Sequence, residues 1–182
     1  MNGEAVACYS RQISKYNNIE KYTREKNYPK VSSVVCKDDI KKLGLRTFFF
    51  SDASSAVKTS VFRELHGYDN KDLPISEDMY LANKIIMAGY KIKYCADSVV
   101  YHSHKFMLKQ LYYRYYLSGK FMAQNSYLDQ YKTVRSGRKL ARYVLRRALC
   151  QFNVLVLLRF MPDMIARWLG MRNGRKTVRS DL

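Results

Sequence analysis

The stretch ISEDMYLANKIIMAGYKIKY, residues 75–94, contains a complete helix signal followed by the start of a strand. Ser76 is suited to cap a helix, apolar residues then recur at helical spacing, and Gly89 can supply a left-handed stop. The next run, YKIKYCADSVVYHSH at residues 90–104, alternates between apolar and polar side chains. The sequence therefore predicts a helix that leads directly into a strand or a strand pair.

Two adjacent acids, Glu77 and Asp78, open this helix. Acids in a first helical turn are favoured by the helix dipole by about 0.3–1 kcal/mol each, so capping alone explains them. Asp78, however, lies three and four residues before Leu81 and Ala82 and shares their inward face. An inward carboxylate at the end of a sheet can accept a proton from a bound hydroxyl. The residues themselves leave both roles open.

Upstream of the helix, three shorter segments are expected. EAVACYSRQ, residues 4–12, is typical of a strand, and KDDIKKLG, residues 37–44, of one or two helical turns closed by glycine. Residues 46–69 indicate an aromatic strand, then small residues, then a helix over residues 58–65. Small residues such as those of SDASSA let a ligand approach the backbone closely.

Downstream, residues 106–128 predict a helix rich in aromatic side chains. The tail from Gly137 onward indicates one or two basic helices broken at Pro162. Its mixture of large apolar and basic residues is typical of a helix lying in an anionic membrane surface. A helix packed on its own domain with solvated arginines explains the tail equally well.

Length, charge and cysteine use limit the classes of protein. The 182 residues suffice for one domain, and 33 basic against 15 acidic side chains give a formal charge of +18. Such a surface favours nucleic acid, an anionic membrane or a phosphorylated ligand. No RNA-binding signature is present, and the four tyrosines around Arg114 form a helical stripe that is more typical of a core or an interface. Nucleic acid is therefore the least favoured partner.

Four scattered cysteines lack C-x-x-C spacing, which excludes a zinc ribbon and a thioredoxin-like motif and favours a reducing, cytosolic setting. The sequence has neither a secretory apolar region nor a run of about 20 apolar residues. His102 and His104 alternate on an extended segment, so both can point to one side as metal ligands or phosphate contacts would. They can equally be two ordinary histidines at a strand end.

The order of four stretches across residues 47–121 resembles the C-terminal half of a bacterial family 2 glycosyltransferase, most closely the rhamnosyltransferase branch. These stretches are TFFFSDASSAVKTSVFRELHGYD, ISEDMYLANKIIMAGYKIKY, ADSVVYHSH and QLYYRYYLSGKF. AVACYSRQ and residues 143–174 resemble the same branch more loosely. The resemblance implies an α/β fold, the C-terminal portion of a GT-A sandwich around a mixed sheet, and inverting transfer of a sugar from a nucleotide donor.

The resemblance also implies roles for individual residues. Asp78 matches the general base of the family and Glu77 its neighbour, which favours proton transfer over simple capping. His102, and second His104, match a histidine that the family supplies to the metal or diphosphate. The run containing Asp52 and Ser54 matches the small-residue segment beside the donor sugar, although Asp52 stands where the family often has Asn. Gln110 and Arg114 match positions near the acceptor or diphosphate.

One departure from the family is large. Its members begin with a nucleotide-binding half that ends in an Asp-x-Asp motif for the divalent metal, and no Asp-x-Asp occurs here. We therefore expect a truncated enzyme, a split-gene product or a fragment that needs a complementing N-terminal half. A donor such as dTDP-rhamnose and a Mg or Mn ion are expected only in the complete enzyme.

The expected organisation is an acceptor and catalytic half at residues 1–136 and a basic amphipathic helical tail at residues 137–182. Expected partners are the nucleotide-sugar, a cell-surface polysaccharide or lipid-linked acceptor, and an anionic membrane. The expected location is peripheral, at the cytoplasmic face of the cell membrane. The alternative is a non-enzymatic basic module that binds a membrane or a protein partner.

Overall fold

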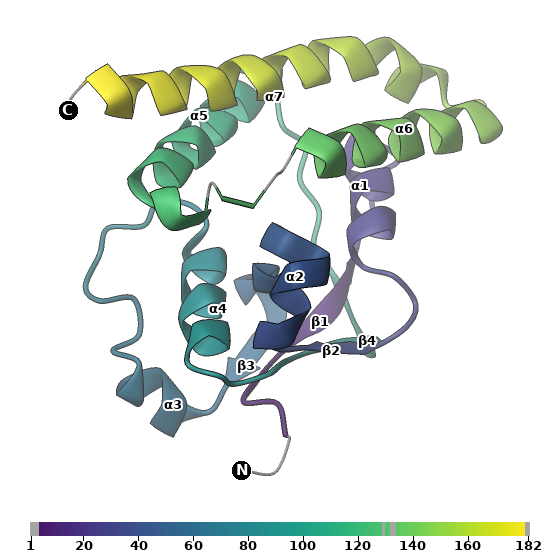
Figure 1. The fold of residues 1–182 in the computed structure, drawn as a ribbon. Helices are drawn as coiled ribbons and strands as arrows, with labels where there is room; N and C mark the ends of the chain where they lie inside the picture. The colour runs from purple at the N-terminus through teal and green to yellow at the C-terminus, as the bar shows by residue number, and fades with distance from the viewer. Residues whose placement is uncertain (1–3, 129, 132–133, 181–182) are drawn as a thin grey trace. The chain divides into compact units, whose positions relative to one another are not determined.

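The structure is a computed structural model, shown in Figure 1, and it describes residues 4–128, 130–131 and 134–180. The chain folds into two compact units. The first unit comprises Met1–Ile13 and Tyr28–His102, and the second comprises Ser14–Asn27 and Ser103–Leu182. The predicted functional boundary at residues 136–137 lies inside the second unit and stays a prediction. The outer ends of the two predicted regions, residues 1–3 and 181–182, lie outside the described residues.

A four-stranded mixed sheet organises the first unit. Its strands are β1 (Ala7–Ile13), β2 (Ser33–Val35), β3 (Ser55–Val57) and β4 (Ile92–Tyr101), in the order β2-β4-β1-β3. β1 and β4 run parallel, while both outer strands are antiparallel to their neighbours. The sheet therefore confirms the mixed α/β class predicted from the sequence. Residues 90–104 form one strand rather than a pair.

Alternate side chains of the two central strands build the core of this unit. Tyr9 and Tyr94 are buried, and their ring centroids lie 5.2 Å apart. Tyr28, Phe49 and Phe50 pack around Tyr9 at centroid distances of 5.5–6.4 Å, all edge to face. Aromatic pairs of this kind add roughly 0.5–1.5 kcal/mol each beyond the area they bury.

Short helical segments connect the strands, and one of them corrects a prediction. They are η1 (Lys37–Asp39), α2 (Ile40–Leu43), η2 (Gly44–Phe48), η3 (Asp52–Ser54) and α3 (Thr59–Glu64). The predicted aromatic strand at residues 47–50 is wrong, because its first residues end the 3-10 helix η2. The rings of Phe48 and Phe50 are almost inaccessible to solvent, although this apolar run is not a strand of the sheet.

Helix α4 (Glu77–Met87) confirms the helix predicted in residues 75–94. Gly89 follows it with φ +89°, the left-handed stop that the sequence indicates. Ser76 is the N-cap residue, but its φ is +64° and its side chain makes no capping hydrogen bond. The helix entry is thus set by an unusual backbone conformation instead of a hydroxyl cap.

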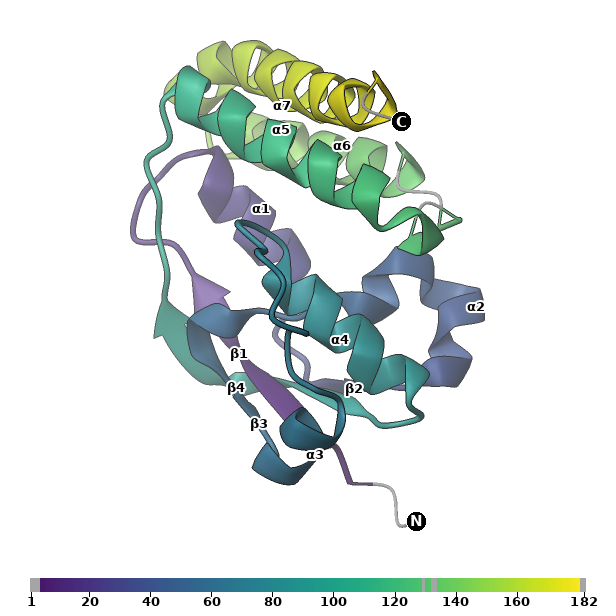
Figure 2. The same ribbon diagram turned by 90° about the vertical axis from the view of Figure 1, so that its left-hand side faces the viewer.

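The second unit is helical. It contains α1 (Ile19–Asn27), α5 (Leu108–Gln124), η4 (Ser126–Leu128), α6 (Val134–Cys150) and α7 (Val154–Ser180), of which α5, α6 and α7 are seen together in Figure 2. Helix α1 is not among the elements predicted from the sequence. Its apolar residues Ile19 and Tyr22 form a core with Val144, Ala148 and Val156 of α6 and α7.

The predicted break at Pro162 is wrong, because α7 runs through this residue. The break lies at residues 151–153, where Phe152 adopts φ +48° and the Asn153 amide N–H bonds to the Ala148 carbonyl. Asn153 then caps α7 by accepting a hydrogen bond from the Val156 N–H at 3.3 Å. The helical tail is thus broken at this turn and is continuous through the proline.

Helices α5 and α7 pack unusually closely. A Cβ added to Gly119, Gly170 or Gly174 would collide with backbone atoms of the facing helix. For Gly170 and Gly174 these atoms include the carbonyl oxygens of Tyr112 and Tyr116. The C-terminal half of α7 is therefore fixed against α5 by three glycines, and the tail is in part a packed helix.

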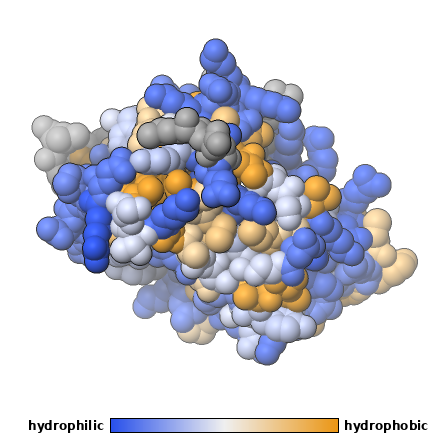
Figure 3. Space-filling model, turned by 90° about the horizontal axis from the view of Figure 1, so that it is seen from below, coloured by the Kyte–Doolittle hydropathy of each residue, from blue (hydrophilic) through white to orange (hydrophobic). Residues whose placement is uncertain are grey.

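The surface reflects the high charge. In Figure 3, which views the molecule from below, hydrophilic side chains cover most of the visible face and hydrophobic ones form separate patches. No helix in the described part of the chain is long and apolar enough to cross a bilayer.

Candidate active site

Acidic side chains and a tyrosine converge in the first unit. Asp52 opens η3, Tyr68 lies in the turn after α3, and Glu77 and Asp78 open α4. The Tyr68 hydroxyl donates a hydrogen bond of 3.1 Å to Oδ2 of Asp52. A cavity of about 410 Å³ lies beside Asp52 and Tyr68, and its other lining residues are Ser55, Val57, Thr59, Phe62 and Leu81. Residues separated by up to 26 positions therefore meet at one site.

Electrostatics links these groups. Burial raises the pKa of Asp52, the hydrogen bond from Tyr68 lowers it in part, and the charge of Glu77 raises it further. Burial also raises the pKa of Tyr68 to about 12, with added contributions from the charges of Asp52, Glu77 and Asp78. Three carboxylates therefore act on one phenol. Tyr68 remains protonated and can donate a hydrogen bond over the whole physiological pH range.

Asp78 is half-buried, whereas Leu81 and Ala82 on the same helix are almost inaccessible. Its Oδ1 accepts a hydrogen bond of 2.7 Å from the Met79 N–H, which lies in the first turn. One carboxylate oxygen thus satisfies the helix start as the capping role requires. A carboxylate has a second oxygen with its own lone pairs, so this bond is compatible with proton acceptance.

The loop that carries Tyr68 and leads into α4 is conformationally strained. His66, Asp69, Asn70 and Ser76 all have φ between +53° and +64°, a region that costs non-glycine residues free energy. Asp69 anchors the loop, since it accepts a hydrogen bond of 2.5 Å from the Tyr80 hydroxyl and pairs with Lys84 at 2.6 Å. Helix α4 therefore holds the turn that presents the Tyr68 hydroxyl.

Ser54, predicted beside the donor sugar, belongs to a hydroxyl chain. Its Oγ lies 2.9 Å from Oγ of Ser10, which in turn lies 2.8 Å from Oγ of Ser98. This chain joins η3 to both central strands at the irregularity between Ser10 and Arg11. It fixes the small-residue run against the sheet beside Asp52.

The two histidines fall in different units. His102 ends the first unit, where its N–H bonds to the Ile13 carbonyl at 3.0 Å. His104 lies in the second unit, where its backbone N–H donates a hydrogen bond of 2.8 Å to Oε2 of Glu20. Its ring stacks on that of Phe106, with the ring centroids 5.0 Å apart. Among the described residues no group of three His, Cys, Asp or Glu side chains could hold a metal ion.

Gln110 and Arg114 lie on the exposed N-terminal half of α5, also in the second unit. The Gln110 side chain accepts a hydrogen bond of 2.9 Å from the Met107 N–H at the start of the helix. The Arg114 guanidinium lies 5.6 Å from the centroid of the Phe106 ring. Of the predicted site residues, the structure brings Asp52, Glu77 and Asp78 together around Tyr68, with Ser54 in the same η3 segment as Asp52.

Tyr68 is the site residue that sequence reasoning missed. It lies 16 residues from Asp52, and no helix or strand periodicity relates residues at this separation. Only the tertiary fold brings the two side chains together. The available signal is its position directly after Gly67, in a turn ahead of the acidic pair.

The two halves of α7 differ in exposure. While the C-terminal half of α7 packs on α5, the N-terminal half exposes large apolar side chains at heptad-like spacing. These are Val154, Leu158, Met161, Ile165 and Trp168, each at least half exposed, with Phe152 and Leu155 beside them. Such a stripe on a basic helix is typical of an interaction surface.

Comparison with known proteins relates the chain to enzymes of O-antigen synthesis. It is 40% identical over 114 residues to the O-antigen chain rhamnosyltransferase RfbN of Salmonella typhimurium, which covers 63% of this chain and 36% of that protein. It is 38% identical over 128 residues to the O-antigen chain rhamnosyltransferase WbaN of Salmonella anatum, covering 69% of this chain and 40% of that protein.

The chain is thus similar to rhamnosyltransferases, in agreement with the resemblance seen in residues 47–121. It spans at most 40% of the length of these curated relatives. No family model matches the chain, and no solved structure matches it.

Proposed function

We propose that this chain forms the catalytic, acceptor-side part of a GT-A-type inverting glycosyltransferase that transfers rhamnose from a donor such as dTDP-rhamnose to a growing cell-surface glycan. The observation that carries the proposal is the cluster of Asp52, Glu77 and Asp78 around Tyr68, in a chain 40% identical to an O-antigen chain rhamnosyltransferase. In this proposal residues 1–136 perform catalysis and residues 137–182 form a membrane-facing tail.

In the proposed reaction, Asp78 accepts the proton of an acceptor hydroxyl as its oxygen attacks the anomeric carbon. The bond from that carbon to the diphosphate breaks, and the nucleoside diphosphate leaves with the bonding electron pair from the opposite face. Removal of a proton by a positioned base contributes roughly 10²–10⁴-fold to a rate. The configuration at the anomeric carbon inverts.

Asp52 and Tyr68 support this role. A carboxylate with a raised pKa is a stronger base, so Asp52 is the second candidate for proton acceptance. Because Tyr68 stays protonated, its hydroxyl can orient Asp52 or a sugar oxygen without carrying a negative charge. Glu77 supplies negative charge that strengthens the affinity of this site for a proton.

The donor diphosphate and its Mg or Mn ion would be held mainly by an N-terminal half, supplied either on the same polypeptide or as a separate chain. The chain has no Asp-x-Asp motif, and its described residues form no three-ligand metal group. His102 or His104 would contact such a metal or diphosphate, and Gln110 and Arg114 would lie near the acceptor or the diphosphate. No step of the proposed proton transfer passes through the metal.

The tail supports a location at the inner face of the cell membrane. Its basic helices and the exposed apolar stripe of α7 fit an anionic bilayer surface, where a lipid-linked acceptor would be reached. This stripe also favours the second candidate function, a membrane- or partner-binding module without catalysis.

A chimera tests the proposal and separates the two functions. The segment of RfbN that matches this chain is replaced by the corresponding residues of this chain, and rhamnose transfer from dTDP-rhamnose is measured. Transfer by the chimera that depends on Asp78 supports catalysis. A folded chimera that binds the donor but transfers no sugar overturns it and leaves the binding module.

A further inference from the structure

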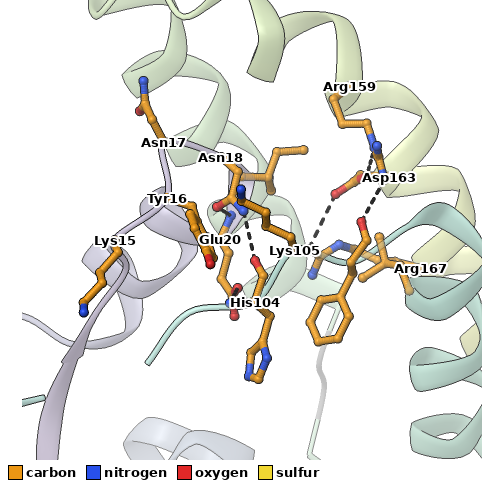
Figure 4. Close-up of a pocket in the computed structure, with 13 residues that line it drawn as sticks. Lys15, Tyr16, Asn17, Asn18, Glu20, His104, Lys105, Arg159, Asp163 and Arg167 are labelled. Atoms are coloured by element: carbon orange, nitrogen blue, oxygen red, sulfur yellow. Dashed lines mark hydrogen bonds and ion pairs between the residues drawn. The ribbon is translucent and has the colours of Figure 1, made fainter. Parts of the chain in front are cut away.

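A second pocket, in the helical unit, is strongly cationic and is separate in sequence from the carboxylate cluster. It has a volume of about 430 Å³ and is shown in Figure 4. Four basic side chains line it against two acidic ones, an excess of two positive charges. They are Lys15, Lys105, Arg159 and Arg167 against Glu20 and Asp163.

The two acids are already engaged by neighbours. Glu20 pairs with Arg24 at 2.6 Å and accepts the His104 N–H at 2.8 Å. Figure 4 shows Arg159 and Arg167 converging on Asp163, and their closest approaches are 2.8 Å and 3.9 Å. One carboxylate shared by two guanidiniums leaves donor capacity for a further anion.

Arg167 gives an independent indication. Its Nε is buried and has no hydrogen-bond partner among the described residues, although Nη1 donates to the Tyr115 hydroxyl. A buried donor without an acceptor is destabilising, and an acceptor oxygen from water or a ligand would relieve this cost. The pocket thus has charge, unused donors and room for an oxyanion.

An apolar groove of about 450 Å³ continues from this pocket. The groove adds Leu155, Val156 and Leu158 to residues shared with the cationic pocket, namely Asn17, Asn18, Ile19 and Arg159. Leu155 is 78% exposed and Leu158 is 72% exposed. Charge and apolar surface therefore meet at Arg159, whose Nη2 also donates to the Phe106 carbonyl at 3.0 Å.

We propose that this combined site binds a phosphorylated lipid, with the phosphate in the cationic pocket and the start of the hydrocarbon chain in the groove. A phosphate offers several acceptor oxygens to guanidinium and ammonium donors, and an amphiphile alone matches both halves of the site. The inference deepens the membrane location under Proposed function and rests on it, but it is independent of catalysis.

Vesicle binding by the full chain tests the inference without any sugar donor. Vesicles of equal surface charge contain either phosphatidic acid or an anionic fatty acid, whose carboxylate carries no phosphate. We expect about tenfold tighter binding to phosphatidic acid, as two or more charge-assisted hydrogen bonds would give. Equal binding to the two kinds of vesicle overturns the proposal.

Matched variants locate the site. The double variant Lys105→Gln/Arg159→Gln should abolish the preference for phosphatidic acid. The control Lys109→Gln/Arg146→Gln removes the same charge from exposed positions outside the pocket and should retain this preference. Leu155→Asn/Leu158→Asn should weaken binding more than Leu145→Asn/Leu149→Asn, which alters exposed leucines of α6. Circular dichroism checks that each variant folds.

Soluble phosphate distinguishes a lipid site from a free-anion site. Inorganic pyrophosphate should compete only weakly, because it cannot occupy the groove. If pyrophosphate binds as tightly as phosphatidic acid vesicles, the groove contributes nothing and the lipid assignment is wrong. Loss of transfer in the RfbN chimera, by contrast, leaves this inference untouched.

Discussion

Tyr68 donates its phenolic hydrogen to Asp52 over 3.1 Å and so ties the strained turn after α3 to the small-residue segment η3. Neither residue belongs to a long regular element. Much of the surface of Asp52 is open to water, but its carboxylate is desolvated enough to raise its pKa. The bond exists because β3 and α3 return the chain past the start of α4. It places a neutral donor among three carboxylates.

The raised pKa of Asp52 makes stability depend on pH in a defined direction. Below the unfolded-state pKa of about 3.9 both states are protonated, and above it the unfolded state ionises first. Stability due to this group therefore falls as pH rises through the window between the unfolded and the raised folded pKa. Urea unfolding should show a smaller fall for Asp52→Asn than for the wild type.

Asp72→Asn is the control for that experiment, because Asp72 is an exposed aspartate of the same loop region. It should keep the wild-type fall. A fall of equal size in Asp52→Asn and the wild type would show that Asp52 is not desolvated.

The pKa of Tyr68, raised to about 12, should drop when Asp52 loses its charge. Burial remains in Asp52→Asn, so we expect the value to stay above the usual value of about 10 for tyrosine. Carbon-13 labelling of the tyrosine rings and NMR titration measure it, with Tyr68→Phe identifying the resonance. An unchanged value in Asp52→Asn would contradict the electrostatic coupling.

Asp78 should dominate catalysis in the RfbN chimera. Asp78→Asn keeps the size of the side chain but cannot accept the proton, so transfer should fall by roughly 10²–10⁴-fold. Glu77→Gln should cost less, since it removes only a neighbouring charge. His102→Ala should weaken donor or metal affinity more than it lowers kcat.

Near wild-type turnover in Asp78→Asn would leave Asp78 as a helix-capping acid. A large loss in Asp52→Asn with no loss in Asp78→Asn would move the base to Asp52. Steady-state kinetics on both variants distinguishes these outcomes.

Gly174→Ala should destabilise the helical unit by about 1–3 kcal/mol, because the added methyl group would overlap the Tyr116 carbonyl of α5. Gly137→Ala is the matched control, since nothing lies within 4 Å of its added Cβ in α6. The control should stabilise by up to about 1 kcal/mol through helix propensity. Thermal unfolding measures both variants, and an increase in the stability of both would contradict the close α5–α7 packing.

The turn at residues 151–153 also makes a testable prediction. Asn153→Ala removes the cap of α7 and its hydrogen bond to the Tyr22 hydroxyl, and should destabilise by about 0.5–2 kcal/mol. Pro162→Ala should instead stabilise, by up to about 3 kcal/mol, because Pro162 interrupts the hydrogen bonding of a continuous helix. Chemical denaturation of both variants measures this. No gain in Pro162→Ala would favour a helix break at the proline.

Local sequence patterns by themselves determined the helices and strands that depend on neighbouring residues. Helical spacing and Gly89 placed α4, a short apolar run placed β1, and alternation placed β4. The acidic pair at residues 77–78 identified the helix start around which the site forms. Each of these depends on side-chain period or on a positive φ, which neighbouring residues reveal.

Only the tertiary structure decided which of these elements meet. Phe49 and Phe50 are apolar in any reading, but only the fold shows that they pack from a non-strand segment against Tyr9, with Phe49 also against Tyr28. The division of His102 and His104 between two units and the pairing of Tyr68 with Asp52 have no local signal. Contacts between distant residues are set by how the elements pack, and the periodicity of a single segment carries no information about its partner.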